Sequence, residues 1–273
     1  MSEHITLTLR APLTSPLEVV GLTPARLSGL GETGIASLAV RAGARVACVG
    51  DFFTVRGSRS DRVCLEGELA LVHGLGAGMA GGTLLVDGDV GDRLGAGMSG
   101  GSVTVLGRAG HDAGVAMAGG TLRVNGDAGD RIGGATPGSA KGMTGGEIIV
   151  GGSAGTEAAL RARRGLVVVC GDAGDRAARA IIAGTLLVFG RTGRDPGRSS
   201  KRGSIVAVGG VAVPSTYAYA CEFEPPFVRL LMTYLTRQYG LAIDDTVMSG
   251  RYRRYCGDAG HPGKGEILEW IAG

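Results

Sequence analysis

The sequence is poor in aromatic residues, has no regular cysteine spacing and lacks long apolar runs. Phe, Trp and Tyr make up 4% of the 273 residues, whereas 52 residues are glycine, a composition that suits thin stacked turns better than a packed α/β core. The five cysteines include no C-x-x-C pair, which argues against a zinc or iron–sulfur site and against a secreted disulfide scaffold. Without a signal peptide or an 18-residue apolar run, we expect a cytoplasmic protein with no membrane partner.

Motifs for nucleotide binding and catalysis are also missing. The glycine run from Gly74 to Gly78 resembles a dinucleotide loop, but that fingerprint needs a following helix and occurs once per βαβ unit. Here the run recurs every 19 residues, no G-x-x-x-x-G-K-[ST] is present, and the four histidines are scattered. We therefore expect no catalytic residue, no metal ion and no firmly bound cofactor. The net charge of +3 is too mild to demand nucleic acid.

What the sequence does contain is a 19-residue repeat between Gly82 and Gly209. One step of 26 residues holds a seven-residue insert, roughly Thr136 to Gly142. Glycine stands at the first and seventh positions of every copy and at the tenth of the first six. The opening glycines are Gly82, Gly101, Gly120, Gly146, Gly165, Gly184 and Gly203. Such a repeat indicates a solenoid.

Each copy predicts one strand, because its third and fifth positions are apolar almost throughout. The unit is too short for a strand and a crossover helix, which need about 30 residues. We therefore predict an all-β fold, a right-handed parallel β-helix with 19-residue coils and small helical additions at the N- and C-terminal ends. Glycine would form the corners. The core would be filled partly by Met79, Met98, Met117 and Met143.

The flanking segments predict three parts. Residues 1–62 hold an N-terminal strand, a short helix and irregular first turns, and residues 63–210 form the regular β-helix. Residues 211–273 form a C-terminal helix and a tail that is mostly loop, with a short apolar strand at Ile267 to Trp270. The C-terminal helix either caps the open end of the coil or docks a partner. Its predicted apolar stripe is Phe227, Leu230, Leu231, Tyr234 and Leu235.

Aspartate recurs at the corners in GDVGDR and GDAGDR. Repeated corner aspartates invite a calcium site. The intervening copies carry arginine, histidine, serine or threonine there, so no continuous set of oxygen ligands exists. We expect each aspartate to bond its own turn, with arginine as its neighbour.

Two outward-facing features are candidate binding surfaces. The fourth strand position is apolar over the last four turns, from Ile149 to Val206, and monomers rarely leave such a stripe bare. Either the chain's own terminal segments or another subunit covers it.

The second feature is a basic patch on one arc of the later coils, which nearby acidic residues offset only in part. It consists of Arg161, Arg163, Arg164, Arg176, Arg179, Arg191, Arg194, Arg198, Lys201 and Arg202. The patch is either a solvated or interface-buried face or a site for a carboxylate-rich ligand. Nucleic acid is disfavoured because no aromatic residues are interleaved. The candidate cofactor-binding residues are Arg161, Arg163, Arg164 and Arg198.

Three stretches carry a family resemblance. The GDVGDRLGAGMSGG-type repeat, the N-terminal LTPARLSGL and the tail YRRYCGDAGHPGKGEIL together resemble the C subunit of formylmethanofuran dehydrogenase and its bacterial counterpart in the formyltransferase/hydrolase complex. The likeness covers nearly the whole chain. The repeat alone is also similar to the C-terminal β-helix domain of the glutamate synthase large subunit, so the tail is the more specific part.

The resemblance implies a non-catalytic structural subunit of a complex that transfers the formyl group from formyl-tetrahydromethanopterin to methylofuran or methanofuran and releases formate. It implies as partners the other subunits of the complex, namely the amidohydrolase-like A subunit, the B subunit and the formyltransferase D subunit, with methylofuran or methanofuran as the cofactor of the complex. The alternatives are the C subunit of an archaeal tungsten or molybdenum formylmethanofuran dehydrogenase and a free-standing glutamate-synthase-type domain. Only three of the 28 basic residues are lysine, and no cysteine-rich cluster domain is present, which favours the bacterial complex.

Overall fold

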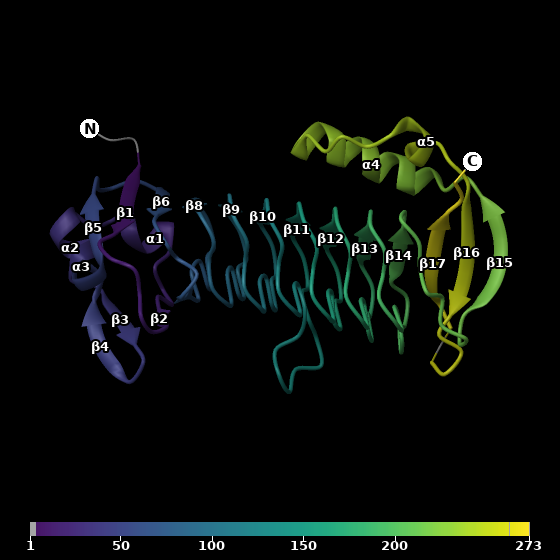
Figure 1. Ribbon diagram of the computed structural model, residues 1–273, viewed down its shortest axis with the longest axis horizontal. Coiled ribbons are helices and arrows are strands. Elements are labelled where there is room, and N and C mark those ends of the chain that lie inside the picture. The colour runs from purple at the N-terminus through teal and green to yellow at the C-terminus, as the bar shows by residue number, and fades with distance from the viewer. Residues whose placement is uncertain (1–3, 262, 273) are drawn as a thin grey trace.

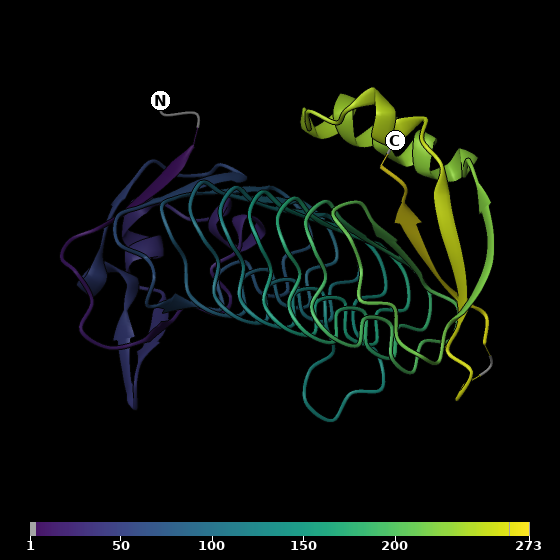
Figure 2. The ribbon, with the colours of Figure 1, turned by 45° about the vertical axis from the view of Figure 1, so that its right-hand side comes forward.

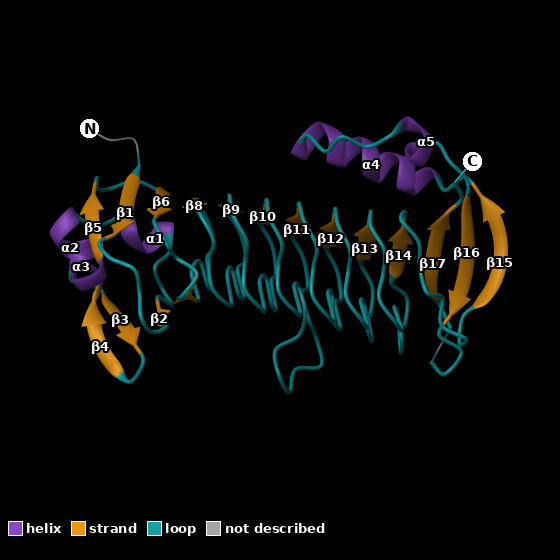
Figure 3. Ribbon diagram, viewed as in Figure 1, coloured by secondary structure: helices purple, strands orange, loops and turns teal. Residues whose placement is uncertain are grey.

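The computed structural model describes residues 4–261 and 263–272, and most of its regular structure is strand (Figure 3). A sheet of 13 strands runs the length of the molecule (Figure 1). Its middle consists of seven parallel strands from the repeat. These are β8 (Thr83–Asp87), β9 (Ser102–Val105), β10 (Thr121–Val124), β11 (Glu147–Val150), β12 (Leu166–Val169), β13 (Thr185–Val188) and β14 (Ser204–Ala207). The prediction of a mostly β fold with a large parallel sheet, as a β-helix requires, is confirmed.

Each repeat strand pairs with the equivalent residues of the next copy. Thr83 lies opposite Ser102, and Ser102 lies opposite Thr121. The insert does not disturb this register, since Thr121 pairs with Glu147. The turns stack behind one another in Figure 2. A second column of parallel bridges follows the ninth position through Leu69, Val90, Ala109, Ala128, Ala154, Ala173 and Thr192.

The apolar strand positions point into the coil. Leu84 and Val86 of β8 expose 1% and 0% of their surface, and the equivalent pairs of the later turns are buried too. The methionines at the second recurring position are fully buried, as predicted: Met79, Met98, Met117 and Met143. Full burial of a large apolar side chain contributes about 1.5–3 kcal/mol. The core is therefore one apolar column along the coil.

The corner glycines serve two different purposes. Gly101, at an opening position, has φ of 81°, a left-handed conformation that L side chains rarely adopt. Gly110, at a tenth position, is required by space instead. A Cβ there would lie 2.3 Å from Asp92 Oδ1 and 2.8 Å from Asp92 N of the preceding turn.

The corner aspartates bond the following turn, so the expectation that they bond their own turn is wrong. Asp92 Oδ1 accepts the N–H of His111 at 2.8 Å, and His111 Nδ1 accepts the N–H of Asp130 at 3.0 Å. In each of these cases a corner side chain accepts a hydrogen bond from a backbone amide of the next turn. The same arrangement joins Asp89 to Arg108, Asp127 to Ser153, and Asp172 to Arg191. These bonds run along the stack because equivalent positions lie directly above one another.

The N-terminal segment closes one end of the core. β1 (Ile5–Leu9) pairs in parallel with β6 (Arg62–Glu66) and antiparallel with β5 (Phe53–Arg56). Ile5, Leu7 and Phe53 are fully buried in the same apolar cluster as the coil interior. The remaining elements here are β2 (Leu17–Glu18), α1 (Pro24–Leu27), α2 (Glu32–Ala36), β3 (Ala39–Ala42), β4 (Arg45–Cys48), α3 (Val49–Phe52) and β7 (Val72–His73).

The C-terminal segment is a hairpin with a helix beside it. Its elements are β15 (Ala218–Phe223), α4 (Pro226–Tyr239), α5 (Asp245–Met248), β16 (Tyr252–Gly257) and β17 (Gly265–Trp270). β17 pairs with β14, and β16 and β15 follow. The strand predicted at Ile267 to Trp270 is therefore present, whereas β15 and β16 lie where loop was expected. Val211, Val213 and Tyr217 pack on the coil core. The interpretation of α4 as an end cap is wrong, because α4 lies over the outer face of β11 to β14 (Figure 1). The division at residues 62 and 210 stays a prediction.

A buried carboxylate anchors the tail to the last coil. Asp258 is 4% exposed, and its carboxylate accepts the N–H groups of Ser199 at 2.7 Å and Gly260 at 2.9 Å. Nearby, the hydroxyls of Ser200 and Tyr217 lie 2.5 Å apart. Burial acts to raise the pKa of Asp258, but these amide bonds outweigh it, and the pKa lies below its ordinary value.

Asp258 should make stability fall in acid. A carboxyl whose pKa is lowered by folding stabilises the native state above its unfolded pKa of about 3.9, and this contribution is lost as pH falls through the folded pKa. We expect Asp258→Asn to lower the unfolding temperature at neutral pH, with the gap to wild type closing at pH values below about 4. Thermal unfolding of wild type and Asp258→Asn from neutral pH to below about pH 4 measures this difference in unfolding temperature. A gap that does not change with pH would contradict the assignment.

The bonds between turns should be measurable one at a time. Asp127 Oδ1 accepts the N–H of Ser153 at 2.8 Å across the insert. Asp127→Ala should lower the free energy of unfolding by about 1 kcal/mol and speed amide exchange at Ser153. Asp127→Asn keeps an acceptor in place and is the matched control. Chemical denaturation and hydrogen exchange report both effects, and equal losses in the two variants would mean that the acceptor is unimportant.

Candidate functional site

The apolar outer stripe is covered by the chain itself. Ile149, Val168, Leu187 and Val206 are at most 1% exposed and form one cluster with the buried face of α4. Tyr252 and Leu268 of the tail hairpin complete this second core. Of the two possible covers, the C-terminal segment is therefore the one observed, and the stripe is not open to a partner protein.

The face of α4 that packs on the sheet is not the predicted stripe. Its buried residues are Val228, Met232, Leu235 and Tyr239. Of the stripe expected from the sequence, only Leu235 is buried and Leu231 is partly buried. The other three side chains point elsewhere and are at least 40% exposed: Phe227, Leu230 and Tyr234.

One carboxylate fixes the end of α4 on the coil. Glu147 of β11 accepts hydrogen bonds from the hydroxyls of Tyr234 and Tyr239. The Arg123 guanidinium donates to the carbonyl of Tyr239 at 3.3 Å. Burial, followed by the bond to Glu147, raises the pKa of Tyr239, so the phenol stays protonated and can donate. α4 is therefore held by both apolar and polar contacts.

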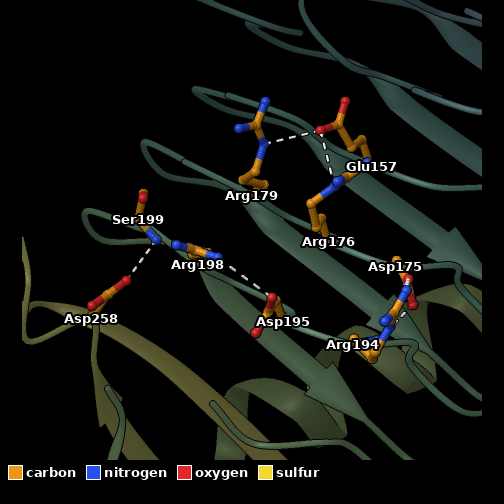
Figure 4. A network of polar contacts seen from close by, with 9 residues as sticks. All are labelled: Glu157, Asp175, Arg176, Arg179, Arg194, Asp195, Arg198, Ser199 and Asp258. Atoms are coloured by element: carbon orange, nitrogen blue, oxygen red, sulfur yellow. Dashed lines mark hydrogen bonds and ion pairs between the residues drawn. The ribbon is translucent and has the colours of Figure 1, made fainter. Parts of the chain in front are cut away.

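Four of the ten basic residues of the patch lie beside an acidic residue of the same or a neighbouring turn. Glu157 lies 3.0 Å from Arg179 Nε and 3.4 Å from Arg176 Nε, as Figure 4 shows. Arg194 pairs with Asp175 at 2.6 Å, and Arg198 lies 3.6 Å from Asp195. The hydrogen bonds from Arg194 lower the pKa of Asp175. The acidic residues thus offset the patch only in part, as the sequence implied.

The four candidate cofactor-binding arginines lie in different parts of the surface. Arg161 donates to the carbonyl of Ser139 in the insert at 2.5 Å, and with Lys201 it lines a groove of about 230 Å³ against the insert. Arg163 and Arg164 are exposed and line a separate hollow of about 310 Å³. Arg198 belongs to the paired group described above. The four residues therefore do not share one pocket.

One set of charges along the stack alternates in sign, which the sequence shows by position. At the twelfth position of the unit, basic and acidic residues alternate from turn to turn: Arg93, Asp112, Arg131, Glu157, Arg176 and Asp195. Arg131 Nε lies 2.7 Å from Asp112 Oδ1. Turns with GDxGDR corners therefore face turns of complementary charge.

The described residues contain no cluster of three or more His, Cys, Asp or Glu side chains that could hold a metal ion. None of the helices in the described ranges is long and apolar enough to cross a membrane. The cysteines Cys48, Cys64, Cys170, Cys221 and Cys256 are free thiols.

No protein-family profile matches this chain, but a curated protein and a solved structure are similar to it. The C subunit of the formyltransferase/hydrolase complex Fhc of Methylorubrum extorquens is 39% identical over 89 residues, which is 33% of this chain and 34% of that protein's length. A chain in the crystal structure of the M. extorquens formyltransferase/hydrolase complex FhcABCD with methylofuran is 38% identical. That match covers 98% of this chain and 100% of the other, with a TM-score of 0.91. The chain belongs to the C-subunit family of formyltransferase/hydrolase complexes.

Membership in the C-subunit family confirms the resemblance drawn from the repeat and the tail. The sequence alignment with the curated relative spans only about a third of that protein, whereas the structural match extends from end to end. The family likeness therefore includes the N-terminal segment and α4 as well as the coil.

Proposed function

We propose that this chain is the non-catalytic, structural C subunit of a formyltransferase/hydrolase complex. In such a complex the formyl group passes from formyl-tetrahydromethanopterin to methylofuran, and formate is released. The observation that carries the proposal is the end-to-end match, at 38% identity and a TM-score of 0.91, to a chain of the complex with methylofuran. Both similar proteins are from M. extorquens, which favours the bacterial complex over the archaeal dehydrogenase.

The chain's role in the proposal is to hold other subunits. The amidohydrolase-like A subunit, the B subunit and the formyltransferase D subunit would supply the chemistry. A right-handed β-helix of 19-residue coils gives a stiff rod, since every turn is bonded to the next by strand pairs and by corner side chains. The five free thiols support a reducing, cytoplasmic setting.

Co-expression tests the proposal directly. A tagged copy of this chain, produced together with its own organism's A, B and D subunits, should retain them through affinity purification and gel filtration. The purified assembly should release formate, and the chain alone should not. If the tagged chain elutes alone although the other three subunits are folded, the proposed function is wrong.

The free part of the basic patch supports a further role in holding the cofactor. Arg161, Arg163 and Arg164 form no ion pair with any acidic residue of the described ranges, in contrast to Arg194. Together with Arg198 they would attract an anionic, carboxylate-bearing tail of a methylofuran-type cofactor. Exposed charges act over about 10 Å at 0.1 M salt, so residues in separate hollows can act on one flexible chain.

Alanine at Arg161, Arg163, Arg164 and Arg198 should reduce the methylofuran that co-purifies with the complex several-fold at low salt. The reduction should shrink at high salt, where wild type also loses cofactor. Arg194→Ala is the matched control, because its charge is already paired with Asp175. Cofactor content can be measured by mass spectrometry of the denatured complex. Equal retention in wild type and the fourfold variant would refute this role.

A further inference from the structure

Helix α4 is apolar on two sides, and only one side is covered. Val228, Met232 and Leu235 face the sheet and are fully buried. Phe227, Leu230 and Tyr234 lie on another flank and are 40%, 71% and 41% exposed. A surface helix needs only one apolar stripe to pack on its own protein, so the second stripe is not needed for that packing.

The exposed stripe has the spacing of a helix-packing ridge. Its three residues follow the i, i+3, i+7 pattern, so they line up along two turns of the 14-residue helix. In Figures 1 and 2, α4 lies outside the coil, with α5 and the segment that leads to it alongside. A groove of about 490 Å³ adjoins the ridge and is lined in part by Arg229, Leu230, Met248 and Gly250. The ridge and the groove together give α4 an exposed surface with the relief that helix packing requires.

The charges that α4 itself places beside this stripe are both positive, whereas Glu224, which precedes the helix, also lines the groove. α4 contains two arginines, Arg229 and Arg237, and no acidic residue. Both are exposed, and neither joins the ion pairs found among residues 4–261 and 263–272. Elsewhere on this protein most corner arginines lie beside a carboxylate. The arginines of α4 therefore complement an acidic partner.

We propose that the exposed flank of α4 is the docking surface for an amphipathic helix of another subunit of the complex. That helix would set apolar side chains against Phe227, Leu230 and Tyr234 and carry Asp or Glu beside Arg229 and Arg237. The inference rests on the proposed function. A lipid surface fits less well, because the Tyr234 hydroxyl is tied to Glu147 and the opposite face of α4 is packed on the sheet.

Single substitutions in the co-expressed four-subunit complex test the docking surface. Leu230→Glu places a charge in the middle of the ridge and should lower the affinity for one co-purifying subunit at least tenfold. Thr236→Glu adds the same charge at an exposed position of α4 outside the ridge and should leave assembly unchanged. Arg229→Glu should weaken assembly mainly at low salt. Phe227→Ala provides a second, milder test of the ridge.

Circular dichroism and thermal unfolding should show folded protein for each variant, since Leu230 is 71% exposed. If wild type assembles and Leu230→Glu and Phe227→Ala assemble as well, the docking surface is wrong and the proposed function stands. Failure of wild type to assemble would instead refute the proposed function. Two further results would contradict the proposal that the partner is a helix of another subunit. One is self-association of the isolated chain that Leu230→Glu abolishes. The other is binding to phosphatidylcholine–phosphatidylglycerol vesicles that the same substitution abolishes.

Discussion

The close stacking of the turns depends on a steric constraint between neighbouring copies of the repeat. A corner carboxylate can reach the backbone amide of the next turn only if the residue just before that amide is a glycine, which has no Cβ. The Asp92 carboxylate occupies the place where a side chain of Gly110 would begin. An aspartate in one copy of the repeat therefore requires a glycine in the next copy. This pairing of aspartate with glycine permits close stacking, and close stacking creates the continuous inner core.

The outer surface is organised differently from the core. The inner positions are equivalent in all turns, whereas the outer face changes along the rod, from polar residues such as Thr104 to apolar ones such as Val168. This change positions α4, because the helix packs only where the outer face is apolar. α4 thus covers the outer face of β11 to β14 but not that of β8 to β10. Asymmetry of this kind gives a repetitive rod distinct surfaces for distinct partners.

The sequence predicted the inner structure well because its constraints are periodic. Alternating apolar residues and corner glycines predicted the strands and the parallel sheet, and the insert left the register intact. Which face of α4 packs on the sheet could not be predicted. Phe227 and Val228 are both apolar, and periodicity does not say which of the two faces is buried. The sequence indicated that acidic residues offset the basic patch in part, but not which arginines they pair with, because partners such as Glu157 and Arg176 lie one turn apart. The contact of Asp258 with Ser199 could not be predicted, because it forms only when the tail folds back onto the last coil, and no local sequence pattern indicates that return.

The alternation of charge at the twelfth position makes successive turns unlike each other. Loss of the turn that carries Glu157 would bring Arg131 next to Arg176, with two cations in contact and two lost ion pairs. Loss of two turns would restore the complementary order. Removal of a pair of turns would therefore cost less electrostatic free energy than removal of a single turn, so the charge pattern favours changes of length in even steps.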